Sequence, residues 1–138
     1  MFFIKILFVI DQFDSANNGT TISAKRFVKG LQDRGHEVFI VSTGSVSPNK
    51  YIVRTLPLPI VVSHIVRSQG MCFGIPSKKI FRKALSQVDL VHFYTPFGLS
   101  VHGLKIAEEM KVPHTTAFHV QPENITYTIG LRNKYKSK

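Results

Sequence analysis

The residues that build disulfides and metal sites are scarce in this sequence. It has a single cysteine, Cys72, among 138 residues, so no intramolecular disulfide can form. Without a CxxC pair or a Cys/His cluster, a structural zinc site is also unsupported, and we expect no metal. The low cysteine content fits a reducing compartment, which predicts a cytoplasmic protein.

Long apolar runs are missing as well. No stretch approaches the ~20 residues that a membrane-spanning helix needs. The apolar N-terminus is interrupted by Lys5 and continues into Asp11 instead of a small-residue cleavage site, so it predicts a buried strand rather than a signal peptide. Any membrane contact is therefore expected to be peripheral, on the inner face of the membrane.

Acidic residues are few and unevenly placed. There are 8 Asp and Glu against 18 Lys and Arg, a formal net charge of +10, and no acidic residue lies between Glu37 and Asp89. This acid-free segment interleaves cationic side chains with apolar runs such as residues 56–62. It suits an anionic membrane surface or another polyanion, and the equal alternative is a solvated basic face over an ordinary core. Because no helix-turn-helix or RNP signature is present, we expect no specific nucleic-acid partner.

The remaining composition fits one globular domain. The sequence is 43% hydrophobic and 19% charged, and a chain of this size buries roughly two-thirds of its unfolded surface. We expect one domain over residues 1–131. The basic tail, residues 132–138, is expected to be solvated, since four of its seven residues are Lys or Arg.

Strands and helices are predicted to alternate along the chain. Apolar runs predict strands over residues 5–10, 37–42, 51–53, 89–94 and 115–119. Helical spacing of apolar residues predicts helices around Ala24 to Leu31, after Ser77, and over residues 99–110. The segment from 43 to 76 is the least regular, and its prolines and glycines argue against a long element there. The alternation predicts an α/β fold: a doubly wound, Rossmann-like parallel sheet with helices on both faces.

In such a sheet the ligand crevice lies beyond the carboxyl ends of the strands. Residues 11–21, 95–98 and 119–124 are expected to meet there. The first segment has one glycine where a dinucleotide fingerprint has three. The backbone N–H groups of Gly19, Thr20 and Thr21 at a helix N-terminus still favour a phosphate, and the alternative is an ordinary loop with threonine caps. Asp11 and Asp14 are expected to cap or to be solvated, and His92 to be a hydrogen-bonded core residue.

Several short motifs, taken in order, resemble one known family. They are Asn18-Gly19-Thr20-Thr21, Arg34-Gly35-His36-Glu37-Val38, Asp89-Leu90-Val91-His92 with Thr95-Pro96, Val112-Pro113, and Thr116-Ala117-Phe118-His119. Across residues 5 to about 119 the chain is similar to the N-terminal domain of the retaining glycosyltransferases called family 4 or group 1. The resemblance implies the GT-B architecture, in which two Rossmann-like domains face each other. The first binds mainly the acceptor, and the second mainly the nucleotide-sugar.

The resemblance also implies a donor-side contact and a catalytic residue. Asn18, Gly19 and Thr20 would approach the donor phosphates when the domains close, although the family usually has two glycines where this chain has Asn18-Gly19. His119 matches the family's histidine near the reacting sugar and acceptor, where it would orient a hydroxyl or balance charge. The alternative for His119 is a hydrogen-bonded residue at the end of a strand.

Four further residues are candidates for acceptor binding: Phe97, Gly98, Glu123 and Asn124. Glu123 and Asn124 could hydrogen-bond a polyol, and Phe97 with Gly98 could line an acceptor pocket. The alternatives are solvation for the carboxylate and ordinary packing for the phenylalanine.

The reaction implied by the resemblance is transfer of a hexose from a nucleotide-sugar, with retention, to an acceptor such as a membrane glycerolipid. The nucleotide-sugar is a substrate, and no cofactor is expected. Nothing in residues 120–138 resembles the family's E-x7-E donor region, so we expect an incomplete first domain, inactive alone, whose partner is the missing donor-binding domain or subunit. The alternatives are a non-catalytic Rossmann-like module that binds a nucleotide or a partner, and a subunit of a split enzyme.

Overall fold

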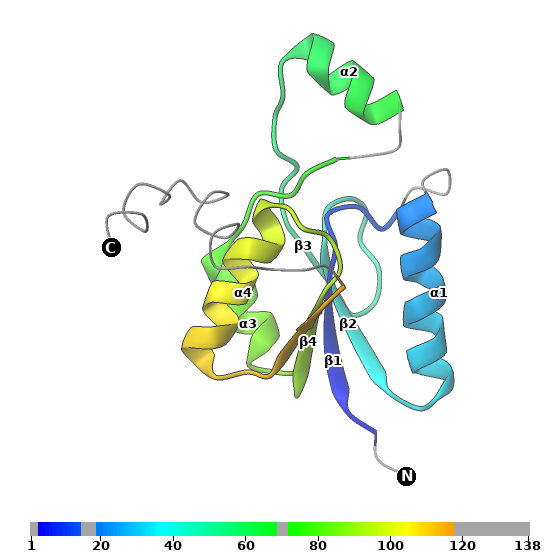
Figure 1. Ribbon diagram of the computed structural model, residues 1–138, viewed down its shortest axis with the longest axis vertical. Coiled ribbons are helices and arrows are strands. Elements are labelled where there is room, and N and C mark those ends of the chain that lie inside the picture. The colour runs from blue at the N-terminus through cyan, green and yellow to red at the C-terminus, as the bar shows by residue number, and fades with distance from the viewer. Residues whose placement is uncertain (1–2, 15–18, 69–71, 118–138) are drawn as a thin grey trace.

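A five-stranded sheet in the order β3-β2-β1-β4-β5 forms the centre of the fold (Figure 1). The computed structural model describes residues 3–14, 19–68 and 72–117. All neighbouring strands are parallel, as a doubly wound sheet requires. The strands are β1 (Lys5–Val9), β2 (Glu37–Ser42), β3 (Lys50–Ile52), β4 (Leu90–Phe93) and β5 (His114–Thr116).

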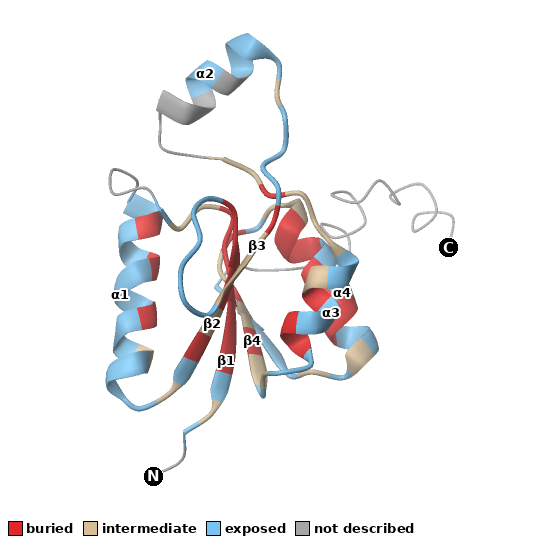
Figure 2. Ribbon diagram, turned by 180° about the vertical axis from the view of Figure 1, so that it is seen from behind, coloured by how far each residue is buried: buried red, intermediate tan, exposed pale blue. Residues whose placement is uncertain are grey.

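Helices cover both faces of this sheet, which confirms the predicted fold class. The helices are α1 (Gly19–Asp33), α2 (Ile60–Ser68), α3 (Lys78–Leu85) and α4 (Gly98–Met110). Figures 1 and 2 show α1 on one face and α3 with α4 on the other, with buried positions concentrated on β1, β2 and β4 between them. The chain therefore forms three layers, with β1 in the middle of the sheet.

The face under α3 and α4 holds the larger core. Ser77 caps α3 as expected, its hydroxyl accepting a hydrogen bond from the Ile80 N–H at 3.3 Å. The rings of Phe81 on α3 and Phe93 on β4 are fully buried. Gly103 lets α4 approach both rings, because a Cβ at this position would lie 2.7 Å from an atom of each. This close approach fixes α4 against the sheet.

The α1 face is less completely covered. Ala24 and Val28 are buried as predicted, but Phe27, expected on the same inward stripe, is 44% exposed. Its ring stacks on His92 of β4 at 5.1 Å between centroids. The physical reason is its position over β4, where it stacks on His92. Among the described residues, Figure 1 shows no second helix beside α1 on this face.

Helix α2 was not predicted. Pro57, Pro59 and Gly70 argued only against a long element, and a nine-residue helix fits between Pro59 and Gly70. Figure 1 shows α2 beyond the carboxyl ends of the strands, apart from the other helices. We call residues 57–72, of which the structure describes 57–68 and 72, the arm. Within the described ranges, no helix is long and apolar enough to cross a membrane.

Candidate functional site

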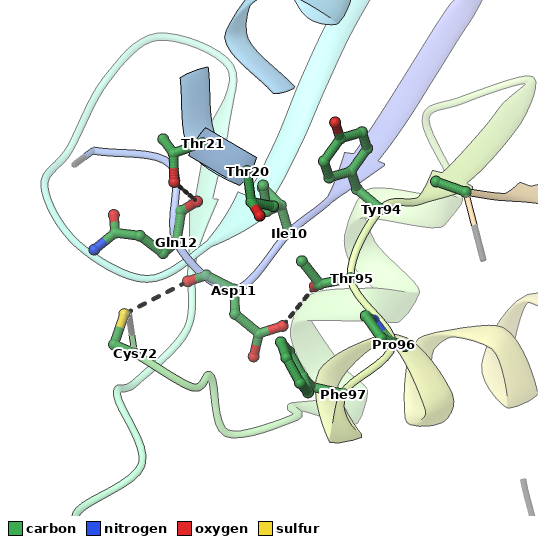
Figure 3. A pocket seen from close by; sticks show the side chains of 11 residues that line it. Ile10, Asp11, Gln12, Thr20, Thr21, Cys72, Tyr94, Thr95, Pro96 and Phe97 are labelled. Atoms are coloured by element: carbon green, nitrogen blue, oxygen red, sulfur yellow. Dashed lines mark hydrogen bonds between the residues drawn. The ribbon is translucent and has the colours of Figure 1, made fainter. Parts of the chain in front are cut away.

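A pocket of about 300 Å³ opens at the carboxyl ends of β1 and β4, the edge where the sequence predicts ligand binding. Figure 3 shows its lining side chains, which come from the loop after β1, the first turn of α1, the base of the arm and the β4–α4 connection. They belong to Ile10, Asp11, Gln12, Thr20, Thr21, Cys72, Tyr94, Thr95, Pro96, Phe97 and Ala117. Two of the three expected segments, 11–21 and 95–98, therefore meet there.

The carboxylate of Asp11 lies at the floor of the pocket and is only 2% exposed. One oxygen accepts a hydrogen bond from the Thr95 hydroxyl at 2.7 Å, and the other accepts one from the Gly74 N–H at 2.7 Å (Figure 3 draws the first). Burial raises the pKa of Asp11 even though both hydrogen bonds oppose the rise. The expectation that Asp11 caps a helix or is solvated is wrong, because its partners come from two distant segments.

The main-chain carbonyl of Asp11 is also fully used. It accepts hydrogen bonds from the hydroxyls of Ser42 at 3.2 Å and Thr43 at 2.7 Å, at the end of β2. The Cys72 thiol donates to the same carbonyl at 3.8 Å and lies 3.0 Å from the Thr43 hydroxyl. Asp11 thus joins the ends of β1, β2 and β4 to the chain returning from the arm.

A second carboxylate of the same loop, Asp14, holds the loop against the β2–β3 connection. It accepts hydrogen bonds from the Ser45 N–H at 2.7 Å, the Ser45 hydroxyl at 3.0 Å and the Lys50 ammonium at 2.9 Å. Partial burial alone would raise the pKa of Asp14, but these bonds together lower it. Its side chain is 38% exposed, whereas that of Lys50 is 1% exposed, so the expected solvation of Asp14 is only partly correct.

The N-terminus of α1 opens toward the pocket. Gly19 and Thr20, two of the predicted phosphate contacts, begin the helix, and Thr20 lines the pocket. Thr21 is 1% exposed, and its hydroxyl donates to the Gln12 carbonyl at 3.2 Å, which ties this turn to the loop after β1. A Cβ at Gly19 would meet no atom within 4 Å, so packing does not require the glycine. Asn18 lies outside the described residues.

Of the predicted acceptor residues, Phe97 lies at the pocket and Gly98 does not line it. The ring of Phe97 packs edge-on against Phe73 at 4.9 Å between centroids, so it forms a rim between the β4–α4 connection and the base of the arm. Gly98 is the first residue of α4. His119, Glu123 and Asn124 lie outside the described residues.

His92 is a structural residue, as predicted, but it is only half satisfied. Its Nδ1 lies 2.7 Å from the Thr115 hydroxyl of β5, whereas its buried Nε2 has no hydrogen-bond partner among the described residues. Burial lowers the pKa of His92. The side chain lies under Phe27, away from the cluster around Asp11, and it plays no part in the pocket.

The described lining combines one carboxylate with hydroxyl groups and aromatic rings. Asp11 is the one carboxylate among the described lining residues, and both of its oxygens are already hydrogen-bonded. The lining also includes the hydroxyls of Thr20 and Thr95, the latter donating to Asp11, and the Phe97 ring, so it combines polar and apolar surface. Sequence reasoning placed both segments at this edge because they follow strand ends, but it did not pair Asp11 with Thr95 or predict that this carboxylate is buried.

Comparison with known sequences points to one family. The model of Glycosyltransferase Family 4 matches residues 17–138. The alpha-monoglucosyldiacylglycerol synthase of Streptococcus pneumoniae is 28% identical over 117 residues, which cover 82% of this chain and 26% of that protein. The protein of the same name from Acholeplasma laidlawii is 23% identical over 124 residues, which cover 82% of this chain and 29% of that protein. The chain therefore spans less than a third of the length of these relatives.

Among solved structures, the C-terminal domain of a hydrogenase from Pyrococcus furiosus is similar with a TM-score of 0.52 and 19% identity. The similarity covers 83% of this chain and 91% of that domain. At this level of identity the likeness concerns the α/β fold alone.

Proposed function

Because the chain belongs to glycosyltransferase family 4, we propose that it forms the acceptor-side part of an enzyme that transfers a hexose from a nucleotide-sugar, with retention, to diacylglycerol or a related membrane glycerolipid. The observation that carries the proposal is the pocket at the ends of β1 and β4, whose lining combines threonine hydroxyls with the Phe97 ring. The names of the glycolipid-synthesising relatives support the lipid acceptor. A donor-binding domain or subunit facing this pocket completes the proposed enzyme.

In this proposal the two sides of the pocket have different tasks. The first turn of α1, with Gly19 and Thr20, contacts the donor phosphates through its backbone N–H groups. Asn18, which precedes the helix in the sequence, is assigned to the same phosphates. Thr95 and Phe97 hold the glycerol backbone and the first methylenes of the acceptor. His119 acts at the reacting sugar, and Glu123 with Asn124 hydrogen-bonds hydroxyls there.

Ligand binding to the chain can be followed residue by residue. Dioctanoylglycerol in neutral micelles should shift the amide NMR signals of Thr95 and Phe97, with empty micelles as the control. Thr95→Val should weaken the response, whereas the far surface variant Lys29→Gln should leave it unchanged. If UDP-glucose alone shifts the signals and dioctanoylglycerol does not, the chain is a nucleotide-binding module and the acceptor-side assignment fails.

The arm is the proposed contact with an anionic bilayer. Ile60 is 89% exposed, Val61 72% and Ile65 54%, and α2 contains no acidic residue. The exposed Arg54 lies at the base of the arm. Exposed aliphatic side chains enter the headgroup boundary of a membrane, and each nearby cation adds about 1 kcal/mol on an anionic surface. Both features lie at the pocket edge of the sheet, where a lipid acceptor would arrive.

Membrane docking can be measured by co-sedimentation with phosphatidylglycerol and phosphatidylcholine vesicles. The chain should bind the anionic vesicles, and binding should weaken with salt. Ile60→Ser with Val61→Ser should lower binding by about tenfold or more, since burial of each side chain contributes about 1.5–3 kcal/mol. Val46→Ser is the matched control, because Val46 is 85% exposed outside the arm. Equal, salt-insensitive binding to both vesicles would contradict the docking.

A further inference from the structure

The arm leaves the sheet through a short paired segment, which we call the neck: residues 54–56 and 73–75. Thr55 and Gly74 form an antiparallel bridge. The Leu56 N–H donates to the Phe73 carbonyl at 2.7 Å, and the Ile75 N–H donates to the Arg54 carbonyl at 2.8 Å. The neck therefore closes the base of the arm, so that the segment entering the arm and the segment leaving it move together.

The neck is bonded directly to the floor of the pocket. The Gly74 N–H, inside the neck, donates to the Asp11 carboxylate at 2.7 Å, and the other carboxylate oxygen accepts from Thr95 at 2.7 Å. The donor residues are separated from Asp11 by 63 and 84 positions. Asp11 therefore fixes the distance between the arm and the acceptor side of the pocket through one buried group.

Side chains pack closely around Gly74, which leaves the neck little freedom to move. A Cβ on Gly74 would lie 3.0 Å from Val53 Cγ2 and 3.1 Å from Leu99 Cδ2. On the pocket side of the neck, Phe73 packs against Phe97 of the rim. A shift of the neck would therefore be felt at the rim, and a Cβ at position 74 requires either these two side chains or the neck to move by a few tenths of an ångström.

We propose that Asp11 is a positioning residue that couples the arm to the pocket, so that docking on a bilayer presents the pocket to a diacylglycerol in that bilayer. This inference rests on the proposed function. Two contacts held at a fixed spacing act as linked sites, so their combined affinity exceeds that of either alone only while the spacing is maintained. The Asp11 carboxylate maintains this spacing by accepting one hydrogen bond from Gly74 in the neck and one from Thr95 at the pocket.

The coupling is tested by vesicle binding with and without the acceptor. Adding diacylglycerol to phosphatidylglycerol vesicles should strengthen binding of the wild-type chain by about tenfold. Asp11→Asn has the same shape but offers an amide NH₂ to one of the two donors. It should keep binding to plain phosphatidylglycerol vesicles and lose the increase from diacylglycerol. Gly74→Ala, which leaves the carboxylate intact, should behave in the same way.

Asp33→Asn is the matched control, because Asp33 is an exposed carboxylate at the end of α1, and it should retain the increase. An Asp11→Asn chain that retains the increase would overturn the proposal. So would a folded Asp11→Asn chain, checked by circular dichroism, that loses all vesicle binding, because the residue would then support the arm itself and not its coupling to the pocket.

Amide hydrogen exchange separates this inference from the proposed function. In Asp11→Asn the amides of Gly74, Leu56 and Ile75 should exchange about tenfold faster, because the loss of a hydrogen bond to a charged group loosens the neck. If these amides exchange faster in Asp11→Asn while the wild-type chain binds no vesicle, the mechanical link is retained and the docking is refuted. Exchange that is faster at Gly74 alone would refute the link, whatever the vesicles show.

Discussion

The Asp11 carboxylate and the Thr95 hydroxyl lie 2.7 Å apart at the bottom of the pocket, although 84 positions separate them in the sequence. Both residues follow strand ends, on β1 and β4, and both are buried. The hydrogen bond therefore closes the pocket floor between two neighbouring strands. The other Asp11 oxygen accepts a hydrogen bond from the Gly74 N–H at 2.7 Å, so both oxygens of this carboxylate take part in holding the structure together.

Removing the Thr95 hydroxyl should destabilise the fold measurably. In Thr95→Val one oxygen of a buried carboxylate loses its partner, which costs about 1–3 kcal/mol in the free energy of unfolding. Urea unfolding followed by circular dichroism measures this cost. Thr95→Ser keeps the hydroxyl and should lose much less; equal stability of the valine variant and the wild type would show that this bond contributes nothing net.

Asp11 should make stability fall as the pH rises through the acid range. Burial raises the pKa of Asp11 above its ordinary value of 3.8, so just above 3.8 the folded chain binds more protons than the unfolded chain. The contribution of Asp11 to the unfolding free energy is largest below pH 3.8 and is lost as the pH rises through the folded-state pKa. The unfolding free energy of wild type minus that of Asp11→Asn, measured in urea at successive pH values, should therefore decrease with pH. A flat or rising difference contradicts the burial effect.

Asp14 should have the opposite pH dependence, because its pKa is lowered. Its stabilisation is present above 3.8 and is lost as the pH falls through the folded-state value. At neutral pH, Asp14→Asn removes the carboxylate partner of the Lys50 ammonium, whose side chain is 1% exposed. The ammonium keeps its hydrogen bond to the Ser45 carbonyl at 2.8 Å. We expect a loss of about 2 kcal/mol, since hydrogen bonds to charged groups contribute roughly 1.5–3 kcal/mol.

A double substitution tests whether that loss comes from the stranded cation. Asp14→Asn combined with Lys50→Met removes the buried charge together with its partner, so the pair should be more stable than Asp14→Asn alone. Urea unfolding of the two single variants and the double variant gives the interaction energy. Additive losses would mean that Asp14 and Lys50 act independently.

The order of strands and helices was predictable because it depends on local patterns. The apolar run of β1 and the helical spacing of Ala24 and Val28 are properties of neighbouring residues, and the structure confirms them. Helix α2 was missed because Ile60, Val61 and Ile65 are exposed, so no amphipathic stripe pointed toward a core. Its helical form depends instead on the space between Pro59 and Gly70.

The site was predictable in place but not in detail. A parallel sheet dictates that ligands bind at the carboxyl ends of its strands, and this located the pocket and Phe97. The role of Asp11 depends on Gly74 and Thr95, which approach it only after the sheet and the neck have formed. No local pattern encodes such long-range partners, so solvation was the natural but wrong expectation for that carboxylate.

Two glycines in helices should respond in opposite ways to the same substitution. Gly30 is exposed on α1, and a Cβ there meets nothing within 4 Å, so Gly30→Ala should stabilise the chain by about 0.5–1 kcal/mol through helix propensity. Gly103 is buried on α4, where a Cβ would lie 2.7 Å from Phe81 Cε1 and from Phe93 Cε1. Overpacking of this kind costs about 1–3 kcal/mol.

The overpacking cost at Gly103 should exceed the gain in helix propensity, because both rings are fully buried and neither can move without disturbing the core between α3, α4 and β4. Urea midpoints of Gly30→Ala and Gly103→Ala should therefore shift in opposite directions from the wild type. If the urea midpoints of both variants rose, α4 would have room to move away from the sheet. The close packing that holds Phe97 and the pocket rim at the start of α4 would then not be rigid.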